Sequence, residues 1–144
     1  MSAPDSGVAY GDAVTIGDRL PPLALAPLSR TTCALFAGSS GDHNPIHIDS
    51  DAAKAAGLPD VIGHGMLSMA MLGRLLTNWA PQAALRGFGV RFQDTTQIGD
   101  AVTCSGEVVE RFVIDGEVRV KIAIAAIDAA GSTKTAGEAI VALP

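Results

Sequence analysis

The sequence predicts a single α+β domain in which an antiparallel sheet curves around one buried helix. A chain of 144 residues has the size of one ordinary domain. Residues 66–79 form an apolar segment in which Arg74 is the only charge. A helix that is apolar on almost every side should be buried on almost every side. The second half of the chain alternates polar and apolar residues, which is typical of half-exposed strands. In so short a chain, that sheet is the natural cover for the helix.

Start and stop signals place the other elements. Ser29 or Thr31 is expected to begin a short helix, and Asp49 or Ser50 a helical turn. Asp115-Gly116 predicts a hairpin turn. The long helix should open at Gly63-His64-Gly65, cover about 65–79 and stop before Pro81. The whole expected order is a flexible segment 1–11, a first strand 12–20, helices 32–37 and 51–56, the long helix, and strands 88–92, 108–114, 117–122 and 134–143.

Composition excludes several classes of protein. Hydrophobic residues make up 48% of the chain and charged residues 17%, which favours a globular domain. A net charge of −5 argues against non-specific nucleic-acid binding. The apolar run 61–76 contains His64, Arg74 and three glycines, so it predicts a buried helix and no membrane span. Without a signal-peptide pattern, a cytoplasmic protein is expected, with Cys33 and Cys104 as free thiols.

A polar loop carries the clearest chemistry. Asp42, His43, Asn44 and His47 lie in a short stretch pinned by Pro45. A carboxylate and an imidazole five positions apart can converge on one water molecule and move its protons. An isolated pattern of this kind is more often an ordinary capped loop. Its place directly before a buried helix favours the catalytic interpretation.

The entrance of the long helix is the second feature. Gly63 and Gly65 allow close approach of the backbone, and the first turn offers unpaired N–H groups. Such donors suit a carbonyl oxygen that becomes negative during a reaction. Glycines chosen for tight packing would give the same pattern.

A metal site is the alternative use of these histidines. His47-Ile48-Asp49 with His64 has the composition of a two-histidine, one-carboxylate iron site. The second histidine lies at a helix entrance, however, and Asp49 is well placed as a helix cap. We therefore expect neither a metal nor a cofactor.

Residues Ser40-Gly-Asp-His-Asn-Pro-Ile-His47, followed by His64-Gly-Met-Leu67, resemble the motif of MaoC-like hydratases and dehydratases. These include (R)-specific enoyl-CoA hydratases and (R)-3-hydroxyacyl thioester dehydratases. The resemblance extends over about residues 12–142. It implies a hot-dog fold, meaning a sheet wrapped around a central helix, usually paired with a second hot-dog subunit as a homodimer or heterodimer.

The resemblance also implies roles for the motif residues. Asp42 and His47 would hold the reacting water, and the backbone N–H of Gly65 would polarise the thioester carbonyl. Asn44, Pro45, His64 and Met66 would shape the loop and line the substrate site. The substrate would be an acyl-CoA or acyl-carrier thioester, hydrated reversibly to a (3R)-hydroxyacyl product. Some members place a serine along the central helix where this chain has 71–74, which leaves Ser68 as the substitute.

Three other functions remain open. The chain could be the catalytic subunit of a heterodimeric 3-hydroxyacyl-carrier dehydratase. A hot-dog thioesterase should carry a carboxylate on the central helix, and residues 66–79 contain none. A non-catalytic acyl-binding subunit should lack Asp42 or His47, and both are present.

Overall fold

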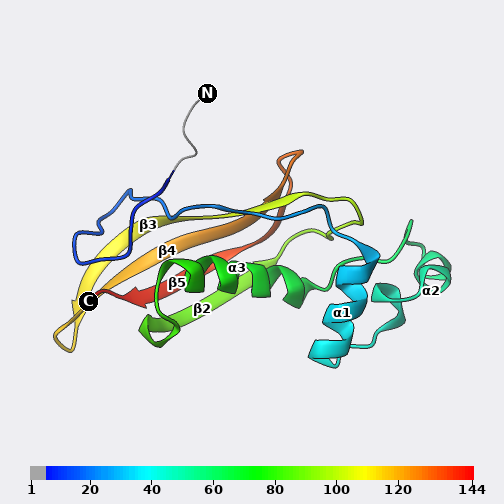
Figure 1. Cartoon of the computed structure of the whole chain (residues 1–144), viewed down its shortest axis with the longest axis horizontal. Helices are drawn as coiled ribbons and strands as arrows, with labels where there is room; N and C mark the ends of the chain where they lie inside the picture. Colours follow the sequence, from blue (N-terminus) through cyan, green and yellow to red (C-terminus); the bar gives the residue numbers. More distant parts are fainter. Residues whose placement is uncertain (1–5) are drawn as a thin grey trace.

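The computed structural model describes residues 6–144 and consists of one antiparallel sheet with a long helix against one face (Figure 1). Two shorter helices lie beyond one end of the long helix. The strand order is β1-β3-β4-β5-β2. The elements are β1 (Leu23–Ala24), α1 (Arg30–Ser40), η1 (Pro45–His47), α2 (Ser50–Ala55), α3 (Gly65–Trp79), η2 (Gln82–Ala84), β2 (Leu85–Phe92), β3 (Val102–Ile114), β4 (Glu117–Asp128) and β5 (Thr133–Ala142). This architecture confirms the α+β hot-dog expectation.

The long helix α3 has the predicted bounds, but it is buried on one side only. Leu72, Leu75 and Leu76 are at most 1% exposed and pack with side chains from β3, β4 and β5. On the other side, Met66 is 56% exposed. The expectation that the helix is buried almost all round is therefore wrong for a single chain, because one sheet covers only one of its faces.

The long hairpin of β3 and β4 forms where the sequence predicts it. Asp115 and Gly116 have φ angles of 52° and 75°, the left-handed backbone of a two-residue hairpin turn. β3 begins at Val102, six residues before the predicted start of that strand. The alternating pattern that predicts a strand is weak at the start of β3, because Cys104 and Gly106 are buried there and neither is a strong strand former.

The predicted first strand at residues 12–20 is absent. Thr15 donates its backbone N–H to the carboxylate of Asp18, and Gly17 has a φ of 91°, so the chain turns there. Backbone bonds of Gly17, Asp18 and Leu20 tie this turn to β3, but residues 12–20 form only one β-bridge, from Arg19 to Glu107. The first strand is instead β1, which pairs with Thr103 and Cys104 of β3.

Part of the N-terminal segment expected to be flexible lies against the core. Residues 1–5 of that segment are outside the described residues. Val8 accepts a hydrogen bond from the Trp79 indole at 2.9 Å, and the Tyr10 hydroxyl donates to the carbonyl of Ala142 at 2.8 Å. These bonds join the segment to the C-terminal ends of α3 and β5. No helix within residues 6–144 has the length and apolar character needed to cross a membrane.

Candidate active site

Local backbone bonds build the loop that presents Asp42. Gly41 ends α1 in the left-handed conformation, with a φ of 77°, and turns the chain out of the helix. The Asp42 carboxylate then accepts the backbone N–H of Asn44 at 3.2 Å, and the Asn44 side chain accepts that of Ile46 at 3.3 Å. Pro45 opens η1, whose last residue is His47. Asn44 and Pro45 therefore shape the loop through their own local contacts.

The imidazole of His47 is buried and has a defined orientation. Its Nδ1 lies 2.7 Å from the carbonyl oxygen of Ile62. A carbonyl can only accept, so Nδ1 must carry the proton that is donated. In the neutral ring, Nε2 is then left as an acceptor. His47 also lines a hollow together with Gly65 and Ser68.

His64 connects the loop to the start of α3. It is the N-cap residue of that helix and is 2% exposed. Its Nε2 lies 3.1 Å from the backbone carbonyl oxygen of Asp42 and 4.0 Å from the carboxylate. The ring stacks on His47 and makes a T-shaped contact with the ring of Phe36. Its Nδ1 is buried and has no hydrogen-bond partner among the described residues.

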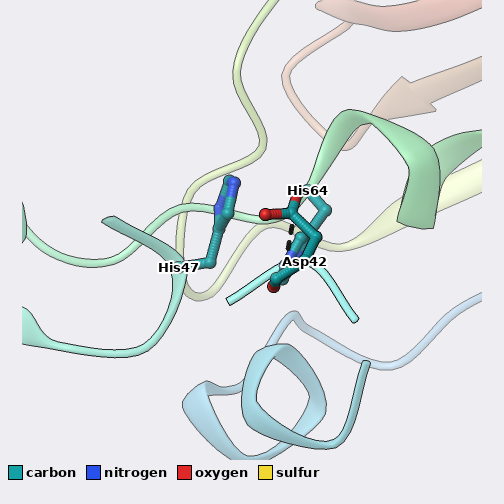
Figure 2. A group of neighbouring side chains, drawn as sticks. All are labelled: Asp42, His47 and His64. Carbon is teal, nitrogen blue, oxygen red and sulfur yellow. Dashed lines mark hydrogen bonds and ion pairs between the residues drawn. The ribbon is translucent and has the colours of Figure 1, made fainter. Parts of the chain in front are cut away.

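Asp42, His47 and His64 converge although the first lies in a loop, the second ends η1 and the third caps the start of α3. One polar atom of each lies within 4.8 Å of the others. Figure 2 shows an Asp42 carboxylate oxygen pointing toward the His47 ring, with His64 behind. The Asp42 side chain is 54% exposed, so the group opens to solvent on the carboxylate side. The sequence-predicted pair is thus brought together beside the entrance of α3.

The two glycines at this entrance have different surroundings. Gly63 donates its N–H to the carbonyl of Thr96 at 2.9 Å, so that donor is already used. Gly65 is the first residue of α3, and its N–H has no partner within the helix. A Cβ at Gly65 would lie 3.1 Å from the ring of Phe92. Gly63 is a packing residue, whereas Gly65 leaves a donor beside His47.

The cluster also has the composition of a metal-binding set, two imidazoles and one carboxylate. The carboxylate is Asp42 and not Asp49. Asp49 caps α2 by accepting the backbone N–H groups of Asp51 and Ala52. Two of the ring nitrogens that could bind a metal ion already have hydrogen-bond partners in the protein. His47 Nδ1 faces the carbonyl of Ile62, and His64 Nε2 faces the carbonyl of Asp42.

Three further residues lie near Asp42, His47 and His64: Met66 and Ser68, which the sequence singled out, and Thr96, which it did not. Met66 lies on the outer side of α3 with Phe36, Asp42 and Phe88. Ser68 is one turn into the helix, and its hydroxyl lies 3.5 Å from that of Thr96. Thr96 was missed, since a buried threonine in a loop between strands has no motif. Its position is set by the long-range bond to Gly63.

Comparisons with known proteins show the family of this chain. The MaoC-like domain family matches residues 12–130. A mitochondrial 3-hydroxyacyl-[acyl-carrier-protein] dehydratase of Arabidopsis thaliana is 30% identical over 67% of this chain and 57% of its own length. An (R)-specific enoyl-CoA hydratase of Rhodospirillum rubrum is 34% identical over 54% of this chain and 56% of its own.

Solved structures of hydratases share the fold of this chain. The unliganded R-hydratase PhaJ1 of Pseudomonas aeruginosa superimposes with a TM-score of 0.81 at 26% identity, covering 96% of this chain and 87% of that one. The (R)-hydratase of A. caviae involved in PHA biosynthesis gives 0.79 at 25% identity, covering 93% and 100%.

The fold defines a hot-dog protein. The chain belongs to the MaoC-like domain family. It spans less than two thirds of the length of the first curated relatives it matches, covering 6% of the fatty acid synthase β subunit of Saccharomyces cerevisiae and 57% of the plant dehydratase.

Proposed function

We propose that this protein is a hydro-lyase that reversibly adds water to a trans-2-enoyl thioester and gives a (3R)-3-hydroxyacyl thioester. The observation that carries the proposal is the convergence of Asp42 and His47, with Gly65, the first residue of α3, lining the same hollow as His47. A water between the two side chains would attack the β-carbon. One of its protons leaves to the pair, and the π electrons move toward the thioester oxygen.

The start of α3 suits the charge that develops in this reaction. The N–H of Gly65 and the positive end of the helix dipole would stabilise the enolate-like oxygen. A proton delivered to the α-carbon completes the addition, and dehydration is the same path reversed. Asp42 and His47 share one water and are coupled, so the acid and base roles belong to the pair.

The carrier on the substrate is CoA or an acyl carrier protein. Of the two relatives described above, the plant dehydratase is named for an acyl-carrier-protein substrate and the Rhodospirillum rubrum hydratase for a CoA substrate. Both names support a thioester substrate. On this proposal the thioester is a substrate, and the reaction uses no cofactor. The thioesterase is the weaker alternative because α3 has no carboxylate, and the non-catalytic subunit is weaker because Asp42 and His47 are both present.

A second hot-dog subunit is the expected partner. Met66 and Phe92 are 56% and 53% exposed, and Met66 lines an outward hollow with Phe36, Met69 and Phe88. An apolar patch of this kind marks an interaction site. Among structural neighbours, ChsH1–ChsH2 and HadBC are complexes. A second copy of this chain would give a homodimer, and a different subunit would give the heterodimeric dehydratase. Light scattering on Met66→Lys tests whether this face holds the partner.

The function is tested by following loss of the enoyl-thioester ultraviolet absorbance with crotonyl-CoA and longer enoyl-CoAs. Stereoselective dehydrogenases identify the product enantiomer. Asp42→Asn is the control, and its rate should fall by about a hundredfold or more, as for loss of a general acid–base group. Wild-type activity that gives the (3R) product supports the proposal. Equal rates for wild type and Asp42→Asn, or absence of activity on both CoA and carrier-protein thioesters, would refute it.

A further inference from the structure

A cavity of about 220 Å³ begins at His64 and follows one side of α3. The helix residues that line it fall on one stripe, at spacings of three and four. The opposite wall is the segment 25–28, whose Leu25 and Leu28 donate backbone N–H groups to β3 and the loop before it, at 2.9 and 3.0 Å. The stripe consists of His64, Leu67, Ser68, Met71 and Arg74.

The middle of the cavity is apolar. Leu25, Leu67, Met71 and Val102 contribute to its walls. These side chains suit a hydrocarbon chain that extends away from the reacting carbons near His64. Gly63 and Ser68 line both this cavity and the hollow that contains His47 and Gly65, so an acyl chain whose thioester lies at Gly65 can run along the helix.

The far end of the cavity carries a positive charge. Arg74 is ten residues beyond His64 in the helix, which is roughly 15 Å along its axis. Among residues 6–144, Arg74 has no ion pair and no side-chain hydrogen bond, in contrast to Arg30, Arg86 and Lys134. Arg74 is exposed, so water hydrates its guanidinium, and a ligand carboxylate would replace that water with charge-assisted hydrogen bonds whereas a methyl group would not.

The field of this charge extends to the inner face of the sheet. Burial raises the pKa of the Cys104 thiol to about 11, and the Arg74 charge acts in the opposite direction. The carboxylate of Asp100, which also lines the cavity, is engaged elsewhere. It accepts the N–H of Gln97 at 2.8 Å and lies 3.3 Å from the Lys134 ammonium. Asp100 is therefore paired with Lys134, and among residues 6–144 no carboxylate forms an ion pair with the Arg74 guanidinium.

We infer that the enoyl thioesters this protein prefers carry a carboxylate at the far end of the acyl chain, and that Arg74 binds it. The guanidinium is planar and offers paired donors that match a carboxylate. The inference rests on the proposed function, because the cavity is assigned to the acyl chain of that substrate. It makes Arg74 a specificity-determining residue with no part in the proton transfers.

The test compares two substrates of equal chain length, trans-2-octenoyl-CoA and the mono-CoA thioester of trans-2-octenedioic acid. The wild type should favour the carboxylate-ended substrate in kcat/KM by roughly tenfold, the size expected for one charge-assisted pair. Arg74→Met keeps a similar stem and should lose this preference while it retains turnover of the methyl-ended substrate. Lys54→Met, an exposed lysine of α2 away from the cavity, is the matched control and should keep the preference.

Calorimetric binding of the corresponding saturated thioesters to the same variants separates this inference from the proposed function. Turnover of both substrates with no preference, or a preference that survives in Arg74→Met, overturns the role of Arg74 and leaves hydration intact. If neither substrate is turned over, the calorimetric affinities of the two saturated thioesters test the role of Arg74. Tighter binding of the carboxylate-ended thioester that is lost in Arg74→Met supports the inference, and equal affinities overturn it.

Discussion

The imidazole rings of His47 and His64 lie stacked, with their centroids 3.8 Å apart and their planes 22° from parallel. This contact joins the end of η1 to the first residue before α3. With the Nδ1 bond to Ile62, it fixes the plane of the His47 ring and the direction of Nε2. His64 in turn holds the backbone of Asp42 through its own Nε2. One buried ring therefore orients both members of the proposed catalytic pair.

His64→Phe tests this positioning role. Phenylalanine retains the stacking surface and removes both the bond to Asp42 and the buried, unpartnered Nδ1. We expect a thermal unfolding midpoint close to that of the wild type. The kcat/KM should fall about ten- to a hundredfold, because the Asp42 loop is less well placed. His47→Gln should cost more, about a hundredfold or beyond, since it removes the reacting nitrogen.

A wild-type rate in His64→Phe would show that the ring does not position Asp42. A large drop in the unfolding midpoint would instead assign His64 a mainly structural role. Measuring both kcat/KM and the unfolding midpoint for His64→Phe and His47→Gln separates the positioning role from the structural one.

Removal of metal ions should leave the hydration rate unchanged. The proposed chemistry needs one water and three protein groups, none of which requires a cation. The measurement is kcat/KM after dialysis against a chelator, together with metal analysis of the purified protein. If activity disappears and returns on addition of Fe²⁺ or Zn²⁺, then Asp42, His47 and His64 act as ligands.

Lys134→Met should destabilise the fold by about 3 kcal/mol at neutral pH, since it leaves carboxylates facing one another without their cation. Lys134 is 4% exposed, and its ammonium lies 3.0, 3.3 and 3.2 Å from Asp94, Asp100 and Asp128. Lys121→Met removes a more exposed lysine that pairs with Glu110, and should cost much less. Urea unfolding of both variants makes the comparison.

The same cluster predicts the response of the wild type to acid. Hydrogen bonds from Ser132 and Lys134 lower the pKa of Asp94 to about 2, and the backbone bond from Ser132 is the largest cause that lowers the pKa of Asp128. Burial lowers the pKa of Lys134, but bonds to the three carboxylates outweigh it and raise the value to about 12.

Because the native carboxylates bind protons less readily than the unfolded chain, their contribution is present above about pH 4 and is lost toward pH 2. The deficit of Lys134→Met should therefore shrink over this range, as its unpaired carboxylates become neutral. A deficit that stays constant from pH 7 to about pH 2.5 would contradict the electrostatic explanation.

Gly137→Ala should destabilise the sheet by about 2–3 kcal/mol, because its Cβ would lie 2.0 Å from the carbonyl oxygen of Gly89 on β2. The obstacle is backbone, so it cannot rotate away. Gly89→Ala is the matched control on the paired strand. A Cβ there meets nothing within 4 Å, and stability should change by no more than about 1 kcal/mol. Equal midpoints in urea for both variants would exclude this close approach.

Much of the fold follows from local signals in the sequence. Ser29 caps α1, Asp49 caps α2, and Asp115-Gly116 makes the β3–β4 turn, because each bonds to or bends its immediate neighbours. The start of β3 was not predictable in this way, because it depends on pairing with distant residues of β1 and β4. The turn at residues 12–20 rests on local signals, the Thr15–Asp18 bond and the backbone of Gly17, which the prediction of a strand overlooked.

For the site, the sequence by itself determined the chemical groups: Asp42 and His47 in one loop, and Gly65 at a helix entrance. Only the tertiary structure decided how they meet. It stacked His64 on His47, set the tautomer of His47 through Ile62, and placed Arg74 at the end of the cavity that starts at His64. The physical reason is the sequence separation over which each kind of interaction acts. Caps and turns act between residues a few positions apart, whereas stacking, burial and cavity shape arise from packing between elements that the chain order leaves distant.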